Sequence, residues 1–164
     1  MGTGKSTVGR LVAEQLRFEF VDTDEIIEAR AGKTITEIFA QNGEAAFREL
    51  EKNLVAELGA REELVISCGG GLVVNEINLA NLKAHSLVVC LWASPEKILA
   101  RVSHQTHRPL LQDPDPMTKI KTLLAEREPF YRQADVIVNT ELRSVKIVAQ
   151  QIVHQFRLGH PAPQ

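Results

Sequence analysis

The sequence predicts an α/β fold with three layers (α/β/α), in which helices cover both faces of a parallel β-sheet. Short apolar segments alternate with helical patterns along the chain, as in repeated β-α-β units. The run SLVVCLW at 86–92 is almost entirely apolar, as expected for a strand that is covered on both faces. A length of 164 residues suits one domain. We therefore expect a single domain over 1–164, with a flexible tail at about 158–164.

The first half of the chain alternates between helical periodicity and short strands. Helices are expected at 6–17, 23–32, 34–43 and 44–58, and strands at 18–22 and 63–67. Gly32 and Gly43 should each end a helix, because glycine tolerates the left-handed backbone that follows a last turn.

The second half continues the alternation around one irregular segment. Helices are expected at 75–85, 94–102, 117–134 and 144–156, and strands at 86–92 and 135–140. Pro129 should bend or end its helix. The segment at about 103–116 has no periodicity and contains three prolines. Long irregular stretches of this kind in compact domains are often functional, so we expect a lid there.

Composition excludes several classes of protein. The net charge is −2, whereas a nucleic-acid-binding protein usually carries a basic excess. No apolar stretch reaches membrane-spanning length, so we expect no membrane partner. Cys68 and Cys90 lie in apolar runs and are expected to be reduced, buried thiols in a cytoplasmic protein. We also expect a monomer.

The opening stretch MGTGKSTVGR contains most of a phosphate-binding loop, whose full pattern is G-x-x-x-x-G-K-[ST]. Glycines let backbone N–H groups converge on phosphate oxygens, and the following helix adds its positive dipole end. Lys5 would reach the β- and γ-phosphates, and the Ser6 hydroxyl would bind Mg²⁺. A glycine-rich tail before an ordinary helix is the alternative. The expected ATP-binding residues of the loop are Gly2, Thr3, Gly4, Lys5, Ser6 and Thr7.

The first glycine of the loop pattern and the strand that should lead into it are absent. In a doubly wound sheet this strand is usually central, so its loss would leave a gap with unpaired backbone groups. We therefore expect Met1 to be an internal methionine of a natural protein that begins upstream.

Charged side chains after the strands are candidate ligands, because such folds bind ligands at the carboxyl ends of their strands. Asp22 and Asp24 suit a metal and a hydroxyl group, although Asp22 could simply cap a helix. Arg48 could form a fork for a planar carboxylate, or a surface ion pair with Glu51 at i, i+3.

Three further features have two interpretations each. Gly69, Gly70 and Gly71 directly follow a strand, where they could let a ligand approach bare backbone or form a plain turn. Arg108 could close onto a transferring phosphoryl group or remain a solvated loop arginine. Phe39 and Phe47 could wall a pocket or pack in the core; their place in the chain fits both.

Taken in order, GTGKST, DTDEIIE, GEAAFRELE, CGGG, RPLL and EREPFYR resemble shikimate kinase, a small P-loop kinase with the nucleoside-monophosphate-kinase-like fold. The resemblance runs from residue 1 to about residue 155, and the family pattern begins about ten residues earlier. It implies Mg²⁺-dependent transfer of phosphate from ATP to the 3-hydroxyl of shikimate, in the chorismate pathway to aromatic amino acids.

The resemblance also implies roles for individual residues. Asp24 would bind the acceptor hydroxyl and act as its base, while Asp22 would help to position Mg²⁺. The family places two arginines on the substrate carboxylate, here Arg48 and Arg132, and Glu51 orients the first of them. The remaining assignments are Gly69, Gly70 and Gly71 on shikimate, Lys5 and Arg108 on the transferred phosphate, and Arg101 and Arg143 near adenine.

Other functions are compatible with parts of this pattern. Gluconate kinase also phosphorylates a polyhydroxy carboxylate, although FRELE and EREPFYR favour shikimate. A nucleoside monophosphate kinase fits less well. A catalytically silent nucleotide-sensing module is the alternative outside the enzymes, and the incomplete loop keeps it open.

Overall fold

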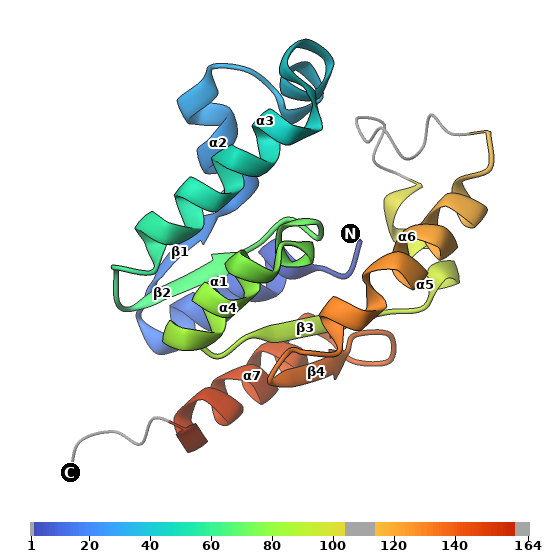
Figure 1. Ribbon diagram of the computed structural model, residues 1–164. Helices are drawn as coiled ribbons and strands as arrows, with labels where there is room; N and C mark the ends of the chain where they lie inside the picture. The colour runs from blue at the N-terminus through green and yellow to red at the C-terminus, as the bar shows by residue number, and fades with distance from the viewer. Residues whose placement is uncertain (1, 104–113, 160–164) are drawn as a thin grey trace.

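The computed structural model describes residues 2–103 and 114–159, in which helices and parallel strands alternate as the sequence predicts (Figure 1). The helices are α1 (Lys5–Leu16), α2 (Thr23–Ala31), α3 (Ile35–Leu58), α4 (Glu76–His85), α5 (Pro95–Val102), α6 (Pro116–Tyr131) and α7 (Val145–Gly159), with a 3₁₀ turn at Leu72–Val74. The strands are β1 (Glu19–Asp22), β2 (Leu64–Ser67), β3 (Val89–Trp92) and β4 (Val136–Asn139). Within the described ranges, no helix is both long and apolar enough to cross a membrane.

The strands form two separate parallel pairs. β1 pairs with β2, with Glu19 opposite Leu64 and Asp22 opposite Ser67. β3 pairs with β4, with Val89 opposite Val136. In the described part of the chain these are two sheets of two strands, and no strand joins β2 to β3. Figure 1 shows the two pairs as distinct ribbons.

A cavity of about 610 Å³ lies between the two pairs. It is lined by every residue of β2 and of β3, whereas no residue of β1 or β4 contributes, so the inner edges of the two pairs border it. α1 contributes Val8 and Val12. This is the position at which the sequence analysis expects a central strand.

Helices pack against both pairs, although Ile137 of β4 remains 49% exposed. Residues of α1, β4 and α7 form one buried cluster, against which side chains of β2 and β3 also pack. A second cluster joins α2 and α3 to β1 and β2. A third forms where α5 meets α6. The predicted layered arrangement is therefore present, but its sheet is divided.

The structure refines three of the predicted elements. Gly43 adopts φ 80° and ψ 168°, so the expected break between two helices is a kink within α3. Pro129 lies inside α6, which continues to Tyr131. β3 is shorter than the apolar run at 86–92, and its residues are half-buried, not fully covered, because one edge borders the cavity.

The two cysteines also border this cavity. Cys68 and Cys90 are free thiols, but they are partly exposed and not buried as expected, because both line the cavity. Desolvation raises the pKa of Cys68 to about 12, and it also raises the pKa of Cys90. Both side chains therefore remain protonated thiols at neutral pH.

Candidate active site

The predicted phosphate-binding loop leads into the N-terminus of α1. Gly4 caps this helix in the left-handed conformation at φ 89°, and Gly2 has φ 66°. A Cβ atom on Gly2 would lie 2.9 Å from a methyl group of Val102, so only glycine fits there. The first N–H groups of α1 and its positive dipole end thus face the site at which a phosphate would bind.

Arg101 fastens this loop to the turn that follows β4. Its guanidinium donates to the side chain and the carbonyl of Thr140 at 2.9 and 2.6 Å, and to the carbonyl of Gly2 at 3.4 Å. Arg143, predicted alongside it, donates instead to Gln151 on the exposed surface of α7. The structure therefore brings Arg101, but not Arg143, against the loop.

Ser6, Asp22 and Ser67 meet where α1 faces the ends of β1 and β2. The Ser6 hydroxyl donates to Asp22 Oδ2 at 2.8 Å, and its oxygen lies 3.4 Å from Ser67 Oγ. Asp22 Oδ1 also accepts from the backbone N–H of Asp24 at 3.1 Å. Asp22 therefore caps α2 with one oxygen while its other oxygen faces Ser6.

This set of oxygen atoms fits Mg²⁺. Among the described residues no group of three or more His, Cys, Asp or Glu side chains could hold a metal. Mg²⁺ does not need one, because it usually binds one or two protein oxygens together with water and nucleotide phosphates. Ser6 and Asp22 supply that kind of partial shell.

Asp24 lies against the turn that follows β2. A Cβ atom on Gly69 would stand 2.8 Å from Asp24 Oδ1 and 3.4 Å from Glu51 Oε1, so bare backbone is required there. Thr23, which is fully buried, fixes this contact. Its hydroxyl donates to the Ser67 carbonyl and accepts from the Gly69 N–H, both at 3.3 Å. Sequence reasoning did not single out Thr23.

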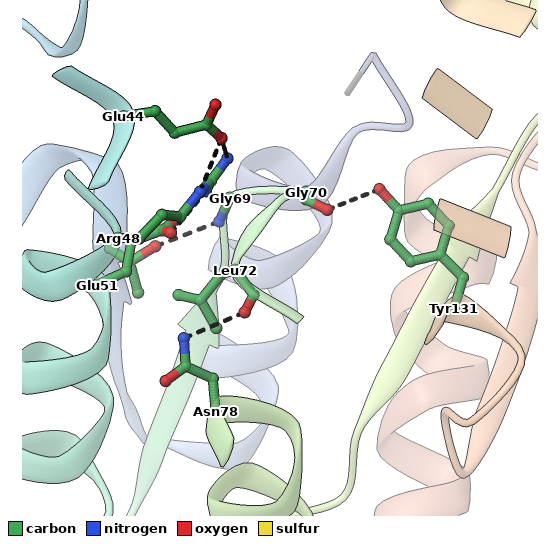
Figure 2. A network of polar contacts seen from close by, with 9 residues as sticks. Glu44, Arg48, Glu51, Gly69, Gly70, Leu72, Asn78 and Tyr131 are labelled. Carbon is green, nitrogen blue, oxygen red and sulfur yellow. Dashed lines mark hydrogen bonds and ion pairs between the residues drawn. The ribbon is translucent and has the colours of Figure 1, made fainter. Parts of the chain in front are cut away.

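Arg48 and Glu51 form a largely buried pair on α3 (Figure 2). Arg48 Nη1 donates to Glu51 Oε2 at 2.6 Å, and the Glu51 side chain is only 1% exposed. Burial raises the pKa of Glu51, and the charge and hydrogen bond of Arg48 oppose that rise. A Cβ atom on Gly71 would lie 2.7 Å from both Nη1 and Nη2 of Arg48. Arg48 and Glu51 are thus not a simple surface ion pair, because they pack against the turn formed by Gly69, Gly70 and Gly71.

Phe47 packs against this arginine from the core, and Phe39 packs against Phe47. Their ring centroids are 5.0 Å apart, and both residues belong to the cluster that α3 buries. The guanidinium carbon of Arg48 lies 5.4 Å from the centre of the Phe47 ring. Phe47 is therefore both a core residue and a packing surface for the guanidinium of Arg48.

Glu44 is a neighbour of Arg48 that sequence reasoning missed. Its Oε1 accepts from Arg48 Nε at 3.1 Å and from Nη2 at 2.7 Å (Figure 2). The signal was available, because glutamate at i−4 is the common partner of a helical arginine.

α6 approaches the same turn from the opposite side. The Tyr131 hydroxyl donates to the Gly70 carbonyl at 2.8 Å (Figure 2). Burial raises the pKa of Tyr131, while the positive charge of nearby Arg127 opposes that rise. The charge of Arg127 also acts on Glu51. Arg127 is therefore close to Glu51 on α3 and to Tyr131 on α6.

The predicted Arg132 has different surroundings. Its side chain is 72% exposed and is paired with Glu128 at 2.5 Å. Since Arg127 and Tyr131 are four residues apart, they share a helix face, whereas Arg132 lies about 140° around the axis from Arg127. The structure thus places Arg127, and not Arg132, beside the Arg48 cluster. Arg108 and most of the expected lid lie outside the described residues.

A phosphate-binding loop, a serine–aspartate pair whose oxygens fit Mg²⁺, and a polar site with an arginine at the ends of parallel strands are together typical of a P-loop kinase of small molecules. Residues 1–157 match the family model described as shikimate kinase. The chain belongs to the shikimate kinase family.

Relatives and solved structures agree with this assignment. The chain is 42% identical over 156 residues to the shikimate kinase of Caldanaerobacter subterraneus, which covers 95% of this chain and 91% of that protein. It is 45% identical over 163 residues to that of Halorhodospira halophila, covering 99% and 92%. A structure titled shikimate kinase from Acinetobacter baumannii in complex with shikimate superimposes with a TM-score of 0.91 at 39% identity, covering 99% and 91%. Agreement at this level confirms the predicted P-loop fold class.

Proposed function

We propose that the chain transfers the γ-phosphate of ATP to the 3-hydroxyl of shikimate, giving shikimate 3-phosphate and ADP. The observation that carries this proposal is the position of Arg48. Its guanidinium lies against Gly71, while Asp24 lies against Gly69 of the same turn. A hydroxy acid that bound across this turn would meet a carboxylate-binding group at one end and a carboxylate base at the other.

The chemistry needs position and charge more than covalent participation. Asp24 would accept the proton of the acceptor hydroxyl and aim its oxygen at the terminal phosphate. Lys5 and the N-terminus of α1 would hold that phosphate, with Arg108 as a further cation. When bound between Ser6 and Asp22, Mg²⁺ would neutralise charge on the phosphates. Gly69 to Gly71 let the substrate approach the backbone without a side chain in the way.

Two arginines, Arg127 in the last turns of α6 and Arg132 at its C-cap, are candidates for the second contact to the acid. We favour Arg127, because its charge acts on Glu51 and on Tyr131. Arg132 is the candidate from the sequence. The two residues provide a matched experiment: Arg127→Ala should raise the KM for shikimate by about tenfold or more, while Arg132→Ala should change it little. The reverse order would restore Arg132 to the acid site.

The function itself is tested by ADP release with different acceptors. Shikimate should stimulate release with Mg²⁺ and ATP, whereas AMP and CMP should not. Greater stimulation by gluconate than by shikimate would identify the related sugar-acid kinase activity. ATP binding without any acceptor-dependent release would indicate a silent nucleotide sensor. We extend the proposal to a cytoplasmic monomer with Mg²⁺ as its metal, which size measurement and metal replacement would test.

A further inference from the structure

We infer that Glu44 competes with the substrate's carboxylate for Arg48, and holds the arginine's fork until the acid displaces it. The inference rests on the proposed function and concerns the same site. It assigns a role to a residue that neither the phosphate-binding loop nor the acceptor chemistry requires.

The pattern of donors on Arg48 supports this competition. A guanidinium has five N–H donors, and Nε with one Nη forms a parallel fork that matches a carboxylate. A single oxygen of Glu44, Oε1, accepts from both donors of that fork, at 3.1 Å from Nε and 2.7 Å from Nη2. Glu51 takes the other nitrogen, Nη1, at 2.6 Å. Gly71 closes the site near Nη1 and Nη2, because its backbone lies directly against them.

The two glutamates differ in how easily they can leave. Glu51 is 1% exposed, so releasing Arg48 would leave a buried charge without its partner. Glu44 is 64% exposed, so water can solvate its carboxylate as soon as it lets go. Glu51 is therefore the permanent support of Arg48, and Glu44 is its exchangeable partner.

The backbone at Glu44 favours a charged side chain in either state. Glu44 follows Gly43, whose non-helical φ and ψ interrupt α3, so it stands at the start of a helical segment. A carboxylate is stabilised by the dipole at such an N-terminus, even without an arginine. Arg48 can thus exchange one carboxylate for another without neutralising Glu44.

Calorimetric titration of the chain with shikimate, without nucleotide, tests the competition. Glu44→Gln should bind shikimate about two- to fivefold more tightly than the unmodified chain, the range that the strength of an exposed ion pair allows. Glu49→Gln is the matched control, because Glu49 is equally exposed on α3 but pairs with Lys52 at 3.6 Å. Its affinity should be unchanged.

A double-mutant cycle separates competition from simple charge repulsion. In an Arg48→Ala background, Glu44→Gln should no longer tighten binding, because there is no fork to release. Persistent tightening there would mean repulsion at a distance and would overturn the inference. Weaker or unchanged binding by Glu44→Gln alone would also overturn it, and would make Glu44 a support for Arg48. If the unmodified chain fails to bind shikimate while it binds ATP, the proposed function itself is wrong.

Discussion

The polar site around Arg48 and the cavity between the strand pairs are built in opposite ways. At the site, backbone and side chains touch closely enough that a single Cβ atom on Gly69 or Gly71 would collide. The cavity, with a volume of about 610 Å³, lies between β2 and β3, and apart from the buried Ser67 the residues of these two strands are only half-buried. The same strand, β2, thus ends in a tightly packed turn and borders an open space along its edge.

The contrast is clearest for the acceptor side chains, although Gly69 and Gly70 of the adjoining turn also line the cavity. Asp24, Arg48 and Glu51 all come from α2 and α3, which pack with β1 and β2 in one buried cluster. The nucleotide half is different, because its loop opens α1, which borders the cavity through Val8 and Val12. We therefore expect changes at the acceptor site to alter the reaction, and changes at the cavity to alter stability.

The largest effect is expected from Asp24→Asn. Loss of the general base should lower kcat by about 10²- to 10⁴-fold. ATP binding should be nearly unchanged, since the amide keeps the shape of the side chain against Gly69. Steady-state kinetics and nucleotide titration would measure both quantities. Near-normal turnover would exclude the base role of Asp24.

A smaller effect is expected from Gly71→Ala. The added methyl group would stand 2.7 Å from Nη1 and Nη2 of Arg48 and force the guanidinium away. The KM for shikimate should rise about 10- to 100-fold, as for the loss of a hydrogen bond to a charged group. Gly59→Ala is the control, because a Cβ there meets its nearest atom at 3.4 Å. Equal effects of the two substitutions would show that Gly71 has no special role.

Much of the fold could be predicted from periodicity, but the site needed information on burial. The i, i+3 spacing of Arg48 and Glu51 fits a surface pair as well as a carboxylate site, and only the burial of Glu51 separates them. Arg127, which we propose for the acid site, was not singled out because the family resemblance pointed to Arg132. A helical pattern was visible: Ile120, Leu124, Arg127 and Tyr131 recur at intervals of four, three and four residues on one face.

The cavity was predictable for a different reason. The described residues include no strand before the phosphate-binding loop, and they leave a space where that strand was expected. The half-buried state of β3 was not predictable from its own residues. An apolar run shows what a strand can bury, but its actual burial depends on the neighbours that the chain supplies.

Filling the cavity should mainly change stability. A variant chain extended before Met1 by about five apolar residues of high strand propensity could place a strand between β2 and β3. Each buried side chain contributes about 1.5–3 kcal/mol, less about 1.5 kcal/mol per ordered residue, so a net gain of a few kcal/mol is expected. The midpoint of thermal unfolding should then rise by about 5–10 °C.

An extension of the same length with alternating lysines is the control for this effect, because charged side chains cannot enter an apolar cavity. Its midpoint should stay near that of the unextended chain. If both extensions raise the midpoint equally, the strand does not occupy the space between the pairs.

The smallest effect is a pH dependence that originates at Glu51. Burial raises its pKa above the ordinary value of 4.5, so the folded protein takes up this proton at a higher pH than an exposed glutamate would. The ionised form that holds Arg48 therefore dominates only above the raised pKa, and it is lost as pH falls through it. The KM for shikimate should rise severalfold on acidification toward pH 4.5. Glu51→Gln should remove that rise, because an amide does not titrate; a rise of the same size in the variant would assign the pH dependence to another group.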